Sequence, residues 1–293
     1  MNVRRELDEK ALKVAEKLVA QDPRDVYNRR VLASAHMGMA YGLINEEHWD
    51  LARVQLRKAQ AILTELAAED PRNIETRQEL AEIHYRLGNS YVQAGQAQQG
   101  VNDLRQALEY QTQLEADLPE NPKLRSETAS TCHFLGVALG NLGRRTEAVS
   151  FLNRAIAIRT ASLEADPRDS RTQSLLAGNY SERAKVLLDT GRNAEALSSA
   201  RRAVELQEQV FAKDGKSIPV RISRAEYEGR LASACAAMAL RGKASSTEAL
   251  EWYRRSLSDW DELNGEGVLR GPNVQSDIAK LRREFQNFQQ HAP

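Results

Sequence analysis

The sequence predicts an all-α fold, a right-handed α-solenoid made of antiparallel helix hairpins. Three observations support this prediction. Landmark residues recur at 48-residue intervals over most of the 293 residues. Apolar residues recur three and four positions apart, which is the spacing of one helix face. With 16 glycines, 8 prolines and 5 % aromatic residues, the chain has too few turn-forming and aromatic residues to favour a β-sandwich or a barrel.

A column of prolines sets the repeat. Pro23, Pro71, Pro119 and Pro167 each lie one full period apart, and Gly215 continues the series. Two residues after each position comes a residue whose side-chain oxygen can accept a hydrogen bond from the first turn of a helix. These predicted N-cap residues are Asp25, Asn73, Asn121, Asp169 and Ser217. Half a period after three of the prolines stand Gly95, Gly143 and Gly191, which we expect to end a helix at its C′ position.

Each 48-residue repeat is therefore predicted to contain a first helix (A), a turn and a second helix (B). The A helices are expected over residues 26–44, 74–93, 122–142, 170–190 and 218–240. The B helices are expected over 48–69, 97–117, 145–165, 193–213 and, after a five-residue insertion, 247–263. A helix of about 20 residues is roughly 30 Å long. Because one hairpin has apolar residues on both sides, neighbouring units must stack.

The two ends of the chain carry one further helix each. In residues 3–20 one face holds the apolar residues Val3, Leu7, Ala11, Val14 and Leu18, which predicts a B-type helix without an A partner. In residues 273–289 a stripe of Val274, Ile278, Leu281, Phe285 and Phe288 predicts a terminal capping helix. The predicted organisation is an orphan B-type helix in 1–21, five hairpins in 22–264, and a linker with the capping helix in 265–293.

The 48-residue repeats resemble tetratricopeptide repeats, whose signature is W-x2-LG-x2-Y, then A-x3-F, then P. The second repeat reads His84-x2-Leu87-Gly88-x2-Tyr91, and the third repeat contains Ala148-x3-Leu152. The family's usual period is 34 residues, so each helix here is about two turns longer. This resemblance implies a solenoid and a non-catalytic scaffold for protein–protein interaction.

A second resemblance concerns the hairpin ends. The segment Glu164-Ala165-Asp166-Pro167-Arg168 and the run from Tyr253 to Trp260 are similar to repeat regions attached to bacterial serine/threonine kinases. The chain itself has no glycine loop over a strand, no HRD and no DFG motif. This resemblance implies the alternative function, a regulatory or substrate-recruiting repeat segment of a larger multidomain bacterial protein.

Composition narrows the class of partner. Lys plus Arg and Asp plus Glu both number 41, so the formal net charge is zero, which disfavours general binding to nucleic acid or anionic membranes. The first eight residues lack the apolar core of a signal peptide. The longest run of small apolar residues, 231–240, is too short to span a bilayer. We therefore expect a cytoplasmic chain whose partner is a protein or peptide, with the oligomeric state open.

The residues that could form a metal or phosphate site are better explained as packing and turn residues. His36, His84 and Cys132 occupy one column, but packed helix axes lie about 8–10 Å apart, whereas zinc ligands converge to about 2.0–2.3 Å from one point. The triplet Gly215-Lys216-Ser217 resembles the end of a phosphate loop, yet the first glycine of that loop is replaced by Val210 and no strand precedes it. The sequence predicts no enzyme, no cofactor and no metal site.

In the tetratricopeptide family the A helices line a concave groove. Two columns, fourteen and eighteen positions after the proline, are four apart and so share one helix face. The predicted partner-binding residues in these columns are Met37, Tyr41, Tyr85, Asn89, His133, Val137 and Lys185. A peptide anchored on Tyr41, Tyr85 and His133 is one hypothesis; the other is that these side chains fill the space between successive A helices. In the fourth and fifth repeats the two columns hold mostly small residues, and the groove there is expected to be shallow or occupied.

Overall fold

The computed structural model describes residues 3–269 and 272–292. These residues form twelve α-helices and no strand. The helices are α1 (Val3–Gln21), α2 (Val26–Asn45), α3 (Trp49–Glu69), α4 (Ile74–Gln93), α5 (Ala97–Asp117), α6 (Pro122–Asn141), α7 (Arg145–Ala165), α8 (Ser170–Leu188), α9 (Asn193–Asp214), α10 (Ile218–Ala239), α11 (Ser246–Gly265) and α12 (Pro272–His291). The predicted boundaries agree with these to within two residues, although residues 1–2, 270–271 and 293 of the predicted terminal segments lie outside the described residues.

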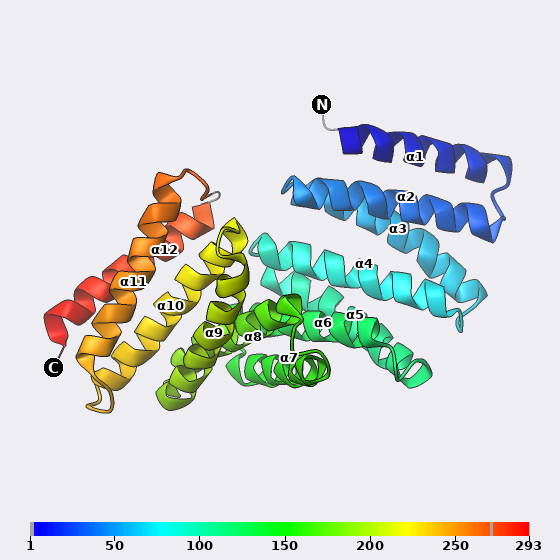
Figure 1. Ribbon diagram of the computed structural model, residues 1–293. Coiled ribbons are helices and arrows are strands. Elements are labelled where there is room, and N and C mark those ends of the chain that lie inside the picture. Colours follow the sequence, from blue (N-terminus) through cyan, green and yellow to red (C-terminus); the bar gives the residue numbers. More distant parts are fainter. Residues whose placement is uncertain (1–2, 270–271, 293) are drawn as a thin grey trace. The chain divides into compact units, whose positions relative to one another are not determined.

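The chain divides into two compact units, unit 1 (Met1–Gly143) with α1 to α6 and unit 2 (Arg144–Pro293) with α7 to α12. Inside each unit, every helix packs against the next helix along the chain. Alternate helices also contact one another: α4 contacts α6, and α10 contacts both α8 and α12. Figure 1 shows the antiparallel arrangement of successive helices within each unit. Such contacts between sequence neighbours confirm an all-α helical-repeat solenoid.

Side chains cap the A helices as predicted in four places. The Asp25 carboxylate accepts a hydrogen bond from the Asn28 backbone N–H at 2.6 Å. The equivalent bonds to Asn73, Asn121 and Asp169 measure 3.0, 3.1 and 3.0 Å. Ser217 occupies the same position before α10 but its hydroxyl makes no capping bond. Each cap satisfies a backbone donor that the first turn of a helix leaves unpaired.

The turns between A and B helices use left-handed backbone. Gly95, Gly143 and Gly191 have φ values of 75°, 73° and 69°, which confirms their prediction as C′ residues. In the first hairpin the same position is held by Glu47, with φ of 59°. A side chain disfavours this conformation, because Cβ approaches the following carbonyl oxygen. The turn therefore forms at Glu47 against the residue's own preference.

Within a hairpin the A and B helices cross at small residues. In unit 1 these are Gly88 of α4 and Gly100 of α5, and the equivalent residues in unit 2 are Ala184 of α8 and Ala196 of α9, both fully buried. A Cβ added to Gly88 would lie 2.5 Å from Leu104 Cγ and 3.0 Å from the Gly100 carbonyl oxygen. Glycine is therefore required at position 88 for α4 and α5 to approach this closely.

Candidate functional site: a cavity beside α10

The middle of one face of α10 carries four small side chains. Gly229, Ser233, Ala236 and Ala237 share this face because they are three or four positions apart. They form the floor of a cavity of about 600 Å³ in unit 2. Apolar walls come from α8 through Leu188 and from α12 through Leu281 and Phe288. The volume falls within the range of about 300–1,000 Å³ that is usual for ligand sites.

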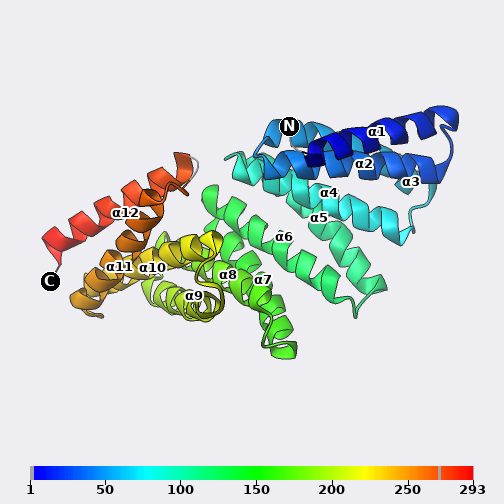
Figure 2. The ribbon, with the colours of Figure 1, turned by 45° about the horizontal axis from the view of Figure 1, so that its top comes forward.

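The position of α12 depends on its apolar stripe. Figure 2 shows α12 beside α11. The rings of Phe285 and Phe288 of α12 lie 5.5 and 6.2 Å from the ring of Tyr253 of α11. Leu281 reaches α10 at Gly229, where an added Cβ would lie 3.1 Å from one of its methyl groups. The missing side chain at Gly229 lets α12 approach α10 and form one wall of the cavity.

Charged side chains of both signs surround the apolar interior. Arg230 donates a hydrogen bond to Ser181 Oγ at 2.8 Å and forms ion pairs with Glu182, at 2.7 Å, and with Glu226. Burial alone would lower the pKa of Arg230, but the two carboxylates outweigh it and the pKa is raised. Ser233 Oγ donates to Glu284 Oε2 of α12 at 2.7 Å. An apolar side chain flanked by polar groups suits this environment.

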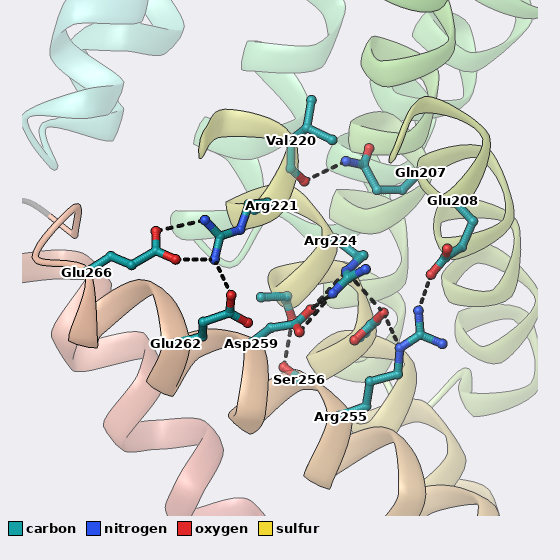
Figure 3. Close-up of polar contacts among 12 residues, drawn as sticks. Gln207, Glu208, Val220, Arg221, Arg224, Arg255, Ser256, Asp259, Glu262 and Glu266 are labelled. Carbon is teal, nitrogen blue, oxygen red and sulfur yellow. Dashed lines mark hydrogen bonds and ion pairs between the residues drawn. The ribbon is translucent and has the colours of Figure 1, made fainter. Parts of the chain in front are cut away.

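The other side of α10 is held by a buried ionic cluster. The Glu228 side chain is fully buried, with Oε1 2.8 Å from Arg255 Nε and 3.8 Å from Arg224 Nε. Arg224 also binds both oxygens of Asp259, and Arg255 pairs with Glu208 (Figure 3). Three carboxylates thus share two guanidinium groups. Burial, only partly offset by the arginines and reinforced by Asp259, raises the pKa of Glu228 to about 7.

In unit 1 the predicted groove residue Tyr41 packs between two A helices. The Arg86 guanidinium carbon of α4 lies 3.7 Å from the centre of its ring, and its hydroxyl donates to Glu82 Oε1 at 3.2 Å. Burial and the Glu82 carboxylate raise the pKa of Tyr41 to about 12. Tyr41 therefore already has contacts on both its ring and its hydroxyl.

The remaining predicted groove residues divide between the two units. The Phe134 ring of α6 packs edge-on against Tyr85, at 5.9 Å, and against His133, at 5.1 Å. Asn89 and Val137 are half-buried, whereas Met37 is 9 % exposed and belongs to the core of unit 1. Lys185 is exposed at the cavity of unit 2. The structure thus places Tyr41 and Tyr85 between successive A helices, whereas His133 packs on Phe134 of its own helix.

The buried histidines bind side chains of the B helices. His36 Nδ1 donates to Gln55 Oε1 at 2.8 Å, and His84 Nδ1 donates to Asp103 Oδ1 at 3.0 Å. Cys132, in the same column, is buried. Within residues 3–269 and 272–292, no group of three or more His, Cys, Asp or Glu side chains is placed to hold a metal ion. None of the helices in this described part is both long and apolar enough to cross a bilayer.

Sequence reasoning did not identify the cavity. The signal was present, because the groove columns of α8 and α10 hold Ser181, Gly229 and Ser233, while a separate apolar stripe runs along α12. The small residues alone are equally compatible with a shallow surface. Only the docking of Leu281 and Phe288 opposite them encloses a volume.

Models of the tetratricopeptide-repeat family match residues 81–113 and 128–169, which include the signature residues Gly88 and Gly136. Over these two segments the chain carries tetratricopeptide repeats. Tetratricopeptide repeats serve as scaffolds for protein–protein interaction. Among curated proteins, none matches the chain.

Solved structures agree with the tetratricopeptide-repeat fold. BtubC (BKLC) from P. vanneervenii superposes with a TM-score of 0.63 at 15 % identity, over 92 % of this chain and 93 % of that protein. The apo form of RapI gives 0.61 at 14 % identity, over 94 % of this chain and 65 % of RapI. Aspartyl phosphate phosphatase F from Bacillus subtilis gives 0.51 at 15 % identity, over 92 % and 70 %. At these identities the likeness concerns the fold.

Proposed function

We propose that this chain is a non-catalytic scaffold that holds a peptide or partner helix on the face lined by its A helices, with the cavity beside α10 as the docking point. The observation that carries the proposal is the cavity of about 600 Å³ between α8, α10 and α12, with its floor of small residues. Tetratricopeptide repeats are interaction modules, and this cavity gives a partner side chain room in unit 2.

The chemistry of the lining defines the partner. An apolar side chain that enters between Leu188, Leu281 and Phe288 is removed from water. This burial contributes about 1.5–3 kcal/mol to the free energy of binding. The mouth carries Lys185 and Lys280 as well as acidic residues. Charges of both signs orient a polypeptide more than they attract it. The partner is therefore a segment with one apolar anchor and flanking polar residues.

Selection from a displayed random-peptide library against the full chain supplies the probe, and fluorescence titration then compares variants. Ala237→Trp puts an indole into the cavity from its floor, so we expect peptide affinity to fall at least tenfold. Ala212→Trp makes the same change at an exposed position of α9 outside the cavity and leaves affinity unchanged. Circular dichroism checks that both variants keep the helical content of the wild type.

A third variant tests the other position for the site. Tyr85→Ala removes the aromatic anchor of unit 1 and leaves the cavity intact. If binding is lost with Tyr85→Ala and kept with Ala237→Trp, the A-helix face of unit 1 is the site and the cavity is not. Unchanged affinity in both folded variants rejects the groove altogether.

A further inference from the structure

An apolar stripe on α1 is open to solvent except at its last residue, Leu18, which is half-buried. It consists of Leu7, Ala11, Val14 and Leu18, and the side chains of Leu7 and Val14 are 60 % and 58 % exposed. Ala11 is exposed as well. The next four B helices carry an alanine at the position that corresponds to Ala11. These residues are Ala59, Ala107, Ala155 and Ala203, each of them 0 % exposed. The stripe is therefore a surface that the other B helices bury.

In the other hairpins an A helix covers this surface. His36 of α2 bonds to Gln55 of α3, and His84 of α4 bonds to Asp103 of α5. The position of Gln55 and Asp103 is occupied in α1 by Leu7, which precedes Gln55 by one full period. The complement of α1 is therefore a helix that offers an apolar side chain where the A helices offer a histidine.

The adjoining face of α2 is open in the same way. On α4 the equivalent face holds Glu75, Glu79 and Glu82, which bind Arg30 and Tyr41 of the preceding A helix. The matching residues of α2, again one period earlier, are Tyr27, Val31 and Ser34. Tyr27 is 72 % exposed. The stripe on α1 and these three residues of α2 together form a largely uncharged surface, the α1–α2 face. The helix α1 itself lies at the edge of unit 1 in Figures 1 and 2.

We propose that the α1–α2 face holds α1 of a second copy of the chain in a two-fold symmetric dimer. The stripe is self-complementary when read backwards. In an antiparallel pair centred between Leu12 and Lys13, Leu7 of each copy meets Leu18 of the other, and Ala11 meets Val14. Large residues then pair at both ends, and smaller ones pair where the helices are closest. Such mutual pairing of one patch is what a two-fold axis requires.

The expected area sets the strength of the dimer. A helix of 19 residues is about 28 Å long, and two such helices seated on each other's α1–α2 faces bury roughly 1,000 Å² in total. This area is at the lower limit for a specific interface, so the dimer dissociates in the micromolar range. Beside the stripe, Lys17 of one copy lies between Glu6 and Lys10 of the other. Attraction and repulsion there offset each other, so salt has little effect.

Sedimentation velocity of the full chain between 1 and 200 µM tests the dimer. We expect a shift from monomer to dimer that is the same in 0.15 and 0.5 M NaCl. Val14→Glu introduces a charge into the stripe and keeps the chain monomeric throughout. Val54→Glu is the matched control, because Val54 on α3 is 52 % exposed but lies outside the α1–α2 face, and it dimerises like the wild type.

Cysteine cross-linking tests the geometry. When a Leu7→Cys chain is mixed with a Leu18→Cys chain and oxidised, the mixed disulfide forms in preference to either self-linked product. The native thiols, Cys132 and Cys235, are buried and give the background in the unmodified chain. A wild-type chain that stays monomeric at 200 µM, a dimer that survives Val14→Glu, or preferential self-linking of Leu7→Cys would overturn the proposal.

Discussion

Units 1 and 2 have the same repeat but use the inner face of the A helices differently. In unit 1, large side chains join successive A helices, with Tyr41 against Arg86 and Tyr85 against Phe134. In unit 2, the equivalent columns of α10 hold Gly229 and Ser233, and a cavity remains beside them. The backbone period thus decides which residues share a face, whereas side-chain size decides whether that face is filled.

A second difference lies in the column just before the first groove column. This column holds buried His36 and His84 in unit 1 and buried Glu228 in unit 2. Burial disfavours the charged form of His36 and of Glu228. For a histidine the charged form appears at low pH, and for a glutamate at high pH. The two units therefore respond to pH in opposite directions.

The largest expected effect is the loss of stability of unit 2 at high pH. The pKa of Glu228 is about 7 in the folded chain and 4.5 in the unfolded chain. Its folded pKa is raised, so the stabilising contribution is complete below pH 4.5 and is lost as the pH rises through 7. We expect a decrease of about 2–3 kcal/mol in the free energy of unfolding between pH 5 and 8, measured by urea titration.

Glu228→Gln removes this dependence, so its unfolding free energy stays nearly level over the same range. His36 provides the contrast within unit 1, because burial lowers its pKa below 6.5. Its contribution is present above pH 6.5 and is lost as the pH falls, and His36→Gln removes that loss. Equal pH slopes for the wild type and Glu228→Gln would show that the arginines, and not burial, control this carboxyl group.

The next effect concerns the close crossing of α4 and α5. Gly88→Ala gives unit 1 the residue that unit 2 has at Ala184, but the new Cβ meets Leu104 and the Gly100 backbone. We expect unfolding in urea, followed by circular dichroism, to lose about 2 kcal/mol, the usual cost of overpacking. Gly265→Ala is the control, since its Cβ would have no atom within 4 Å. Similar midpoints for both variants would mean that the hairpin can relax at position 88.

The smallest effect concerns the turns. Glu47 holds the left-handed conformation for which the other hairpins use glycine. Glu47→Gly should raise the free energy of unfolding by about 0.5–1 kcal/mol, because it removes the contact between Cβ and the next carbonyl. Gly191→Ala, at φ of 69°, is the reciprocal change and should lower it by a similar amount. Thermal melts of the two variants should therefore move in opposite directions from the wild type.

Helix positions could be predicted from the sequence because the forces that set them are local. An N-cap oxygen such as that of Asn73 bonds a donor three positions away, and a glycine such as Gly95 permits a left-handed turn wherever it stands. Local preference was not followed at two positions, of which Ser217 holds its predicted N-cap position. Ser217 makes no capping bond, and Glu47 turns without glycine.

The site was less predictable for a physical reason. A helix period assigns Met37 and Tyr85 to one face, but it does not say which neighbouring side chains cover that face. Met37 is in the core, while Tyr85 packs on Phe134, and neither outcome is encoded near the residue itself. Contacts between residues far apart in the chain decide this, because they depend on how closely whole helices approach.

The amino-acid sequence by itself determined the repeat, the helix boundaries, most caps and the glycine turns, since backbone hydrogen bonding and conformational preference act over a few residues. Only the tertiary structure decided that Leu281 and Phe288 of α12 would enclose a cavity over Gly229, that Glu228 would share two arginines with two other carboxylates, and that the stripe on α1 would be left uncovered. Burial is a property of the packed helices together, and so it appears only when they are assembled.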